Sequence, residues 1–103
     1  MRSPATNTRN RASLVLSNAR LVRFESGDHG LLGWASFELY GHVRLDGVAV
    51  RRTRDGRLTL AFPERRDATG RRHPVVRPLN DEARREIEQQ VFAALGLDAE
   101  AAP

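Results

Sequence analysis

Three β-strands are predicted within residues 31–63, LLGWASFELYGHVRLDGVAVRRTRDGRLTLAFP. Apolar and polar residues alternate from Leu31 to Tyr40, which is the two-residue period of a strand with one buried face. In the next strand, Val43 to Val50, the apolar residues Val43 and Leu45 fall at odd positions, whereas Val48 and Val50 fall at even positions. A β-bulge at Asp46-Gly47 would bring both pairs to one face of the sheet.

A hairpin and an upstream strand extend this sheet. Asp55-Gly56 is a good hairpin turn because glycine supplies the positive φ that such a turn needs, and a strand follows from Leu58 to Phe62. Upstream, the apolar residues between Ser13 and Phe24 form a β-like run that ends at a loop of turn-forming residues, Glu25–Gly30. The Pro74–Pro78 segment suits only a sheet edge or a crossing segment because of its prolines.

One helix is predicted near the C-terminus. Asn80 or Asp81 supplies its N-cap, and Gly96 ends it after about Leu95. Apolar residues recur there at i, i+4, i+7 and i+8, as one stripe: Ile87, Val91, Ala94 and Leu95. The predicted fold is therefore α+β, a small antiparallel sheet of four to five strands with one C-terminal α-helix. We expect a single, dimer-forming domain over residues 13–96, a disordered basic tail over 1–12 and a frayed tail over 97–103.

Positive charge is unevenly distributed along the 103 residues. All 17 basic side chains other than histidine are arginines, and the formal net charge is +4. Residues 20–80 hold twelve arginines against seven acidic residues, whereas residues 81–103 hold two arginines against six. A guanidinium offers a planar fork that suits phosphates and base edges better than an ammonium does. A polyanion is therefore expected to meet the body of the domain and not its acidic C-terminal segment.

The residue inventory argues against an enzyme. The chain has no cysteine, its three histidines (His29, His42 and His73) are far apart, and no serine stands in a nucleophile context. We therefore expect no catalytic residue, metal, cofactor or small-molecule substrate. No apolar run approaches the roughly 18 residues that a membrane span needs, and the N-terminal residues lack the apolar stretch of a secretory signal. A cytoplasmic protein without a membrane partner is expected by default.

Two surface features remain after this exclusion. Arginines crowd two predicted turn regions: Arg51, Arg52, Arg54 and Arg57 in the first, and Arg65, Arg66, Arg71 and Arg72 in the second. Exposed turns are charged in most proteins, so the pattern fits solvated turns as well as a phosphate-binding site. Trp34 and Tyr40 share the polar face of their strand, where they could stack bases, seat a second subunit or cover the sheet. We favour a dimer contact, because an exposed tryptophan needs cover.

Several short motifs follow one another in a fixed order: Arg20-Leu-Val-Arg23, Ala35-Ser-Phe-Glu-Leu39, Asp46-Gly-Val-Ala-Val50, the Asp55-Gly56 turn, Leu58-Thr-Leu-Ala-Phe-Pro63 and Pro78-Leu79-Asn80. In this order and spacing, over about three quarters of the chain, they resemble the stage V sporulation protein G family of small bacterial septation regulators. Arg65 and Arg66 fall where that family has a basic pair, and Gly70 falls where it has a turn glycine. In the predicted helix, Arg84, Ile87 and Val91 also match residues of that family.

The resemblance implies a sheet with one C-terminal helix, a homodimer, and binding to DNA and RNA in transcription regulation, septation and sporulation. Our expectation is a cytoplasmic, homodimeric nucleic-acid-binding regulator with weak sequence selectivity. Its contact residues would be Arg65, Arg66, Arg71 and Arg72, helped by Arg51, Arg52 and Arg84, and its dimer contact would include Trp34 and Tyr40. The alternative is a protein-interaction adaptor of the division machinery that uses the sheet edge or the Trp34 face.

Overall fold

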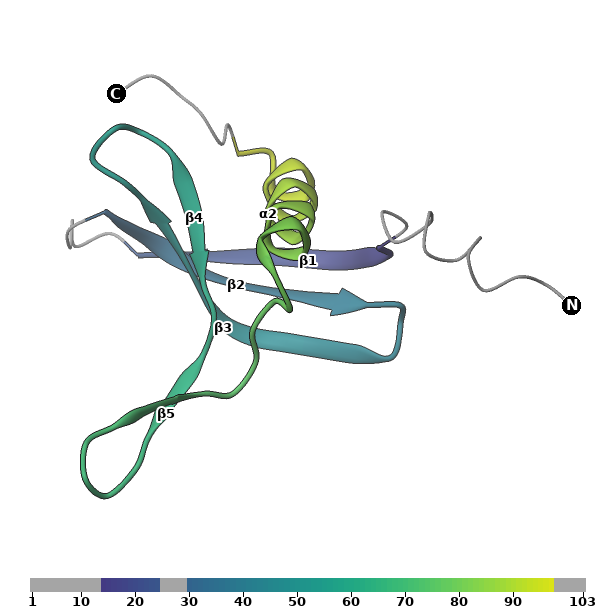
Figure 1. Ribbon diagram of the computed structural model, residues 1–103. Helices are drawn as coiled ribbons and strands as arrows, with labels where there is room; N and C mark the ends of the chain where they lie inside the picture. The colour runs from purple at the N-terminus through teal and green to yellow at the C-terminus, as the bar shows by residue number, and fades with distance from the viewer. Residues whose placement is uncertain (1–13, 25–29, 98–103) are drawn as a thin grey trace, which may run out of the picture.

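A four-stranded antiparallel sheet and one helix form the body of the described part of the protein (Figure 1). The computed structural model describes residues 14–24 and 30–97, so the predicted tail 1–12, most of the loop 25–30 and nearly all of the tail 97–103 lie outside the described residues. The sheet has the order β1-β2-β3-β4, from β1 (Leu16–Arg23), β2 (Leu31–Leu39), β3 (Val43–Arg52) and β4 (Leu58–Ala61). A separate two-stranded sheet, β5 (Glu64–Arg66) with β6 (Arg72–Pro74), precedes the helix α2 (Asp81–Leu95). The predicted α+β fold is confirmed.

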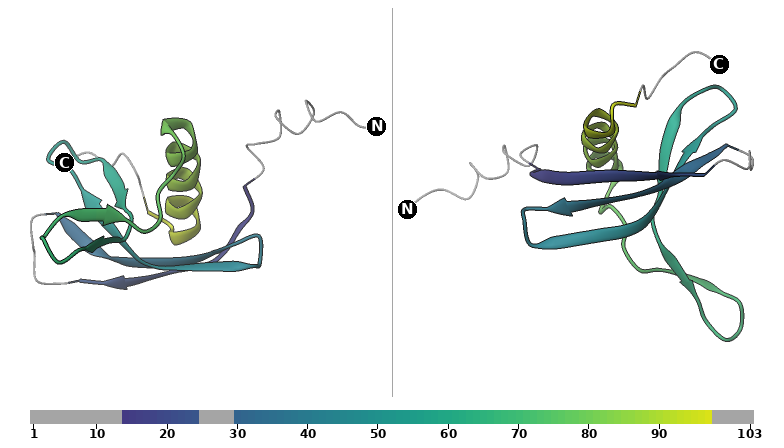
Figure 2. Two further views of the ribbon diagram at one scale, coloured as in Figure 1. Left: turned by 60° about the horizontal axis from the view of Figure 1, so that its bottom comes forward. Right: turned by 180° about the vertical axis from the view of Figure 1, so that it is seen from behind.

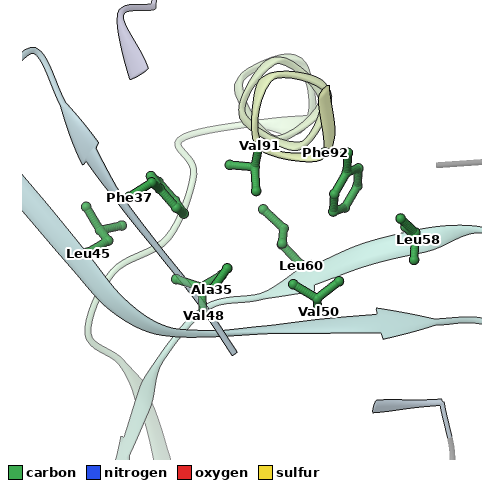
Figure 3. Close-up of a cluster of buried hydrophobic side chains, with 9 residues drawn as sticks. All are labelled: Ala35, Phe37, Leu45, Val48, Val50, Leu58, Leu60, Val91 and Phe92. Carbon is green, nitrogen blue, oxygen red and sulfur yellow. The ribbon is translucent and has the colours of Figure 1, made fainter. Parts of the chain in front are cut away.

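The core lies between α2 and one face of the sheet, as Figure 2 shows from two sides. Side chains of β2, β3 and β4 meet two helix residues there: Ala35, Phe37, Leu45, Val48, Val50, Leu58, Leu60, Val91 and Phe92. In Figure 3 Val91 and Phe92 point down from the helix onto this layer. α2 packs on one face only. Among residues 14–24 and 30–97 no helix covers the opposite face of the sheet, which we call the outer face.

The bulge predicted in β3 is present. Ala35 pairs with Val48 and Phe37 pairs with Leu45, so the two residues Asp46 and Gly47 lie opposite Ser36 alone. Gly47 has a φ of 71°, a conformation that glycine adopts without steric cost. Leu45, Val48 and Val50 are consequently all buried on the helix side of the sheet.

The helix begins and ends where the sequence predicts. The side-chain oxygen of Asn80 accepts a hydrogen bond of 2.8 Å from the amide of Ala83, which is an N-cap, and Gly96 closes the helix with a φ of 71°.

The predicted apolar stripe of the helix is partly wrong. Ala94 is exposed, whereas Phe92, which the stripe leaves out, is 3% exposed. The buried arc of α2 is centred between Val91 and Phe92. At about 100° per residue Ala94 lies about 110° from that centre and Ile87 about 90°, so Ile87 packs at the rim and Ala94 faces solvent. Phe92 instead points toward the sheet between Leu60 and Leu58 (Figure 3).

Candidate nucleic-acid interface

Residues Glu64–Pro74 form a hairpin, which we call the arm, that projects from the body of the protein (Figure 1). The sequence analysis predicts only a turn region here, whereas the structure forms two paired strands. Arg65 pairs with His73 and Arg66 pairs with Arg72 in an antiparallel ladder, and the amide of Val75 continues it with a 3.1 Å bond to the carbonyl of Pro63. The arginines of this segment are therefore carried on a ribbon of defined register.

The turn of the arm explains why so polar a segment forms a hairpin. The amide of Gly70 donates to the carbonyl of Asp67, and Gly70 has a φ of 89°. One carboxylate oxygen of Asp67 accepts bonds from the amide and hydroxyl of Thr69 and from the amide of Arg71, at 2.8, 2.6 and 3.1 Å. Local hydrogen bonds thus replace the apolar packing that the arm lacks.

His73 is a residue of the arm that the sequence analysis leaves unassigned. Its Nε2 lies 2.8 Å from the second carboxylate oxygen of Asp67. The hydroxyl hydrogen bond from Thr69, and then the bond to His73, hold the pKa of the Asp67 carboxyl well below its ordinary range. Because the folded-state pKa is lowered, the stabilisation of the turn is present above about pH 4 and is lost only as the pH falls through the lowered pKa. The arm turn should therefore persist at mildly acidic pH.

Positive charge on the arm is only partly balanced by its own acids. Arg72 lies 3.9 Å from Glu64 in an exposed ion pair, a weak contact. Arg65, Arg66 and Arg71 are exposed and make no side-chain ion pair within residues 14–24 and 30–97. Arg66 stands directly opposite Arg72, and like charges in that position repel each other. A bound anion would relieve this repulsion, so the arm is electrostatically suited to a phosphate backbone.

Arg84 does not belong with these four arginines. Its Nη1 donates to the carbonyl of Leu60 at 2.9 Å and lies 3.2 Å from the carboxylate of Glu88, which accepts a 3.1 Å bond from the amide of Leu60. The guanidinium also lies over the ring of Phe62, 5.8 Å from its centroid. Arg84 and Glu88 together bind the backbone amide and carbonyl of Leu60, on the edge of β4 that faces away from β3, so this pair attaches the helix to the sheet.

Arg51 and Arg52 lie at the other end of β4 from the arm (Figure 1). The Nη1 of Arg52 donates to the carbonyl of Gly56 at 2.7 Å and thereby holds the β3–β4 turn. Arg51 is exposed and pairs with Thr59 across the sheet. Of the seven arginines predicted to contact nucleic acid, the structure gathers four on the arm, uses two within the fold and leaves Arg51 apart.

Trp34 and Tyr40 do not share a face. Trp34 alternates with the buried residues of β2 and is 44% exposed on the outer face. Tyr40 and Gly41 form a two-residue turn with φ values of 57° and 67°, closed by a 3.0 Å bond from the amide of His42 to the carbonyl of Leu39. The positive φ ends the alternation of β2 and turns Tyr40 to the helix side. A single flat contact with a second copy could not cover both rings.

Tyr40 lines a hollow on the helix side of the sheet. A space of about 650 Å³ lies among Tyr40, the connector before α2 and the helix residue Ile87, and a smaller one of about 370 Å³ continues over Val43 and Phe62. Leu79 at its rim is 93% exposed. This hollow, which we call the apolar groove, is a surface that sequence periodicity gives no sign of, because segments far apart in the chain build it.

Within residues 14–24 and 30–97 no group of three His, Asp or Glu side chains is placed to hold a metal ion. In the same residues no helix is long and apolar enough to cross a membrane. No protein-family model matches the sequence. A comparison with curated proteins likewise gives no match.

Proposed function

We propose that this protein is a nucleic-acid-binding regulator whose arm contacts the phosphate backbone. The observation that carries the proposal is the arm itself, a projecting ribbon with four arginines, three of which have no acidic partner in the described residues. Arginine binds phosphate through two parallel hydrogen bonds, and such contacts supply much of the affinity for nucleic acid. In this proposal the sheet and helix serve to position the arm, and the arm makes the phosphate contacts.

The form of the arm favours duplex DNA as one ligand. The major groove of B-form DNA admits a two-stranded β-ribbon, and the arm is such a ribbon. Arg66 and Arg72 lie on one face of it, while Arg65 lies with His73 on the other, so both faces carry positive charge. Contacts of this kind position a protein on a duplex without reading its sequence, which supports weak sequence selectivity.

The resemblance to the stage V sporulation protein G family supports the same proposal. The basic pair of that family falls at Arg65 and Arg66, which the structure places on the arm. We carry over from the resemblance a role in gene regulation and septation, and we keep the cytoplasm as the default location.

A second candidate function is a protein-interaction adaptor of the division machinery. The apolar groove favours it, because Leu79 and Tyr40 leave an unusual amount of apolar surface exposed beside a hollow. In this alternative an apolar segment of a partner protein would fill the groove, and the arginines of the arm would be a solvated surface.

A salt titration separates the two candidates. Four phosphate contacts on one arm should make log affinity for duplex DNA fall against log salt with a slope of about −3.6. The affinity should therefore fall about 100-fold between 50 and 200 mM salt, as fluorescence anisotropy of a labelled duplex would measure. Binding of an apolar segment would hardly change over that range, so the absence of a salt-dependent duplex complex would leave the adaptor as the better account.

A further inference from the structure

A row of outer-face residues crosses all four strands of the main sheet. Val22 pairs with Trp34, Trp34 with Ala49, and Ala49 with Ala61. The row holds one aromatic ring, one exposed valine and two alanines. It ends three residues before the arm begins at Glu64.

Trp34 belongs to a small apolar patch that is separate from the core. Leu31 and Ala49 are 7% and 6% exposed, yet neither is part of the main core cluster. Leu31 pairs with Arg51, and Ala49 pairs with Trp34, so both stand on the outer face. Among the described residues Trp34 is the largest side chain beside them. Trp34 stands opposite Ala49 on this face, and 44% of the residue remains open to solvent.

Two arginines flank the indole diagonally. Arg20 stands two residues before Val22 on β1, and Arg51 stands two residues after Ala49 on β3, both on the outer face. Diagonal neighbours of this kind lie about 7–8 Å apart, within reach of long side chains. Neither guanidinium has an acidic partner in the described part of the chain.

Two acidic side chains of the same face share a single arginine. Arg44 lies 3.5 Å from Glu38 and 3.2 Å from Asp46, and it donates a 3.1 Å bond to the hydroxyl of Ser36. Asn18 donates a further 2.8 Å bond to Glu38. Arg44 offsets only one of these two negative charges. Arg20 and Arg51 bring the arginines of this face to three against two acids, which leaves the face weakly positive.

We propose that this face is a second nucleic-acid site, which takes a single strand by stacking one base on Trp34 while Arg20 and Arg51 bind the phosphates on either side. An aromatic platform beside free guanidinium groups is the arrangement that binds single strands, because every base has a flat apolar face. The chemistry is common to single-stranded DNA and RNA. The site goes beyond the proposed function of the arm, and it would stand even if the arm bound no duplex.

Charge disfavours a second copy of the chain on this face. A two-fold contact centred on Trp34 would bring Arg20 and Arg51 of both copies into one interface. Glu38 and Asp46 could not balance all of them, because Arg44 already offsets one of these two negative charges in each copy. Burying positive charges without partners opposes association, whereas the phosphates of a bound strand would neutralise them.

Trp34 is the only tryptophan of the chain, so its fluorescence reports on this site directly. We expect saturable quenching by oligo(dT) and by oligo(U), and little quenching by a duplex of equal length. The oligonucleotide that binds more tightly shows whether the site prefers single-stranded DNA or single-stranded RNA. The variant Arg65→Ala/Arg66→Ala should retain the quenching, because it alters only the arm. Quenching that vanishes with the arm arginines would overturn the second site.

Variants of the face complete the test, with anisotropy of a labelled single strand as the readout. Trp34→Ala should weaken binding about tenfold or more, and Trp34→Phe should restore much of the loss because a flat ring remains. Arg20→Ala/Arg51→Ala should reduce the magnitude of the log–log salt slope by about 1.4. Tyr40→Ala, on the opposite face, is the matched control and should change neither quantity. Unchanged single-strand affinity in Trp34→Ala would overturn the proposal, as would a Trp34-dependent dimer that excludes the strand.

Discussion

The variant Val91→Asp should be largely unfolded at room temperature. Val91 is completely buried on the helix face, in the cluster that holds Phe37 and Leu60. A carboxylate there would have no partner, since the described structure contains no buried polar or charged side chain to pair with it. The cost should be about 4 kcal/mol or more, a large part of the stability of so small a domain. Far-UV circular dichroism and a thermal melt would measure the loss.

Ala94→Asp is the matched control for this prediction. It introduces the same charge into the same helix three residues later, at a position that faces solvent. We expect a change in the free energy of unfolding within about 0.5 kcal/mol. If both variants melted like the parent, α2 would not pack on the sheet as described. If both unfolded, the helix would bury the face that the simple apolar stripe of the sequence predicts.

The variant Arg65→Ala/Arg66→Ala should lose much of its affinity for duplex DNA and keep its fold. Each lost phosphate contact reduces the magnitude of the log–log salt slope by about 0.9, so two per arm should flatten it by about 1.8. The loss should be similar for all duplex sequences, because the contacts are made to the backbone. The fold should survive, since both side chains are exposed and neither makes an ion pair in the described residues.

Arg54→Ala/Arg57→Ala is the charge-matched control for the arm. These arginines flank the β3–β4 turn, which has the same hydrogen-bond pattern as the turn of the arm and lies at the other end of β4. The control removes the same net charge, so any general electrostatic effect should appear equally in both variants. Equal loss of duplex affinity in the two variants would count against the arm as a specific site and would favour non-specific attraction.

Local chemistry made much of this fold predictable from the sequence. The cap at Asn80, the stop at Gly96 and the bulge at Asp46-Gly47 each rest on a few neighbouring residues. Alternation along β2 likewise reports directly which residues the sheet buries, up to Leu39.

Other features depended on contacts between distant segments or on side-chain hydrogen bonds, and these were missed. The arm has no apolar alternation that would predict strands. Only the turn-forming residues Asp67 and Gly70 indicate its hairpin, and such residues are equally common in ordinary loops. Arg84 matched the resemblance, but its role at Leu60 exists only once helix and strand are packed. The alternation placed Tyr40 on the wrong face of the sheet, because the turn begins at Tyr40 itself, one residue earlier than the alternation suggests.

Mapping of backbone amide shifts by NMR, while a short duplex is added, tests most directly the claim that the arm receives nucleic acid. The largest shift changes should fall within residues 64–74, and the β3–β4 turn, residues 53–57, should change little. Both turns are exposed and carry arginines, so the comparison controls for charge within one molecule. Shift changes centred on the β3–β4 turn, or on residues 77–87 beside the apolar groove, would contradict the account.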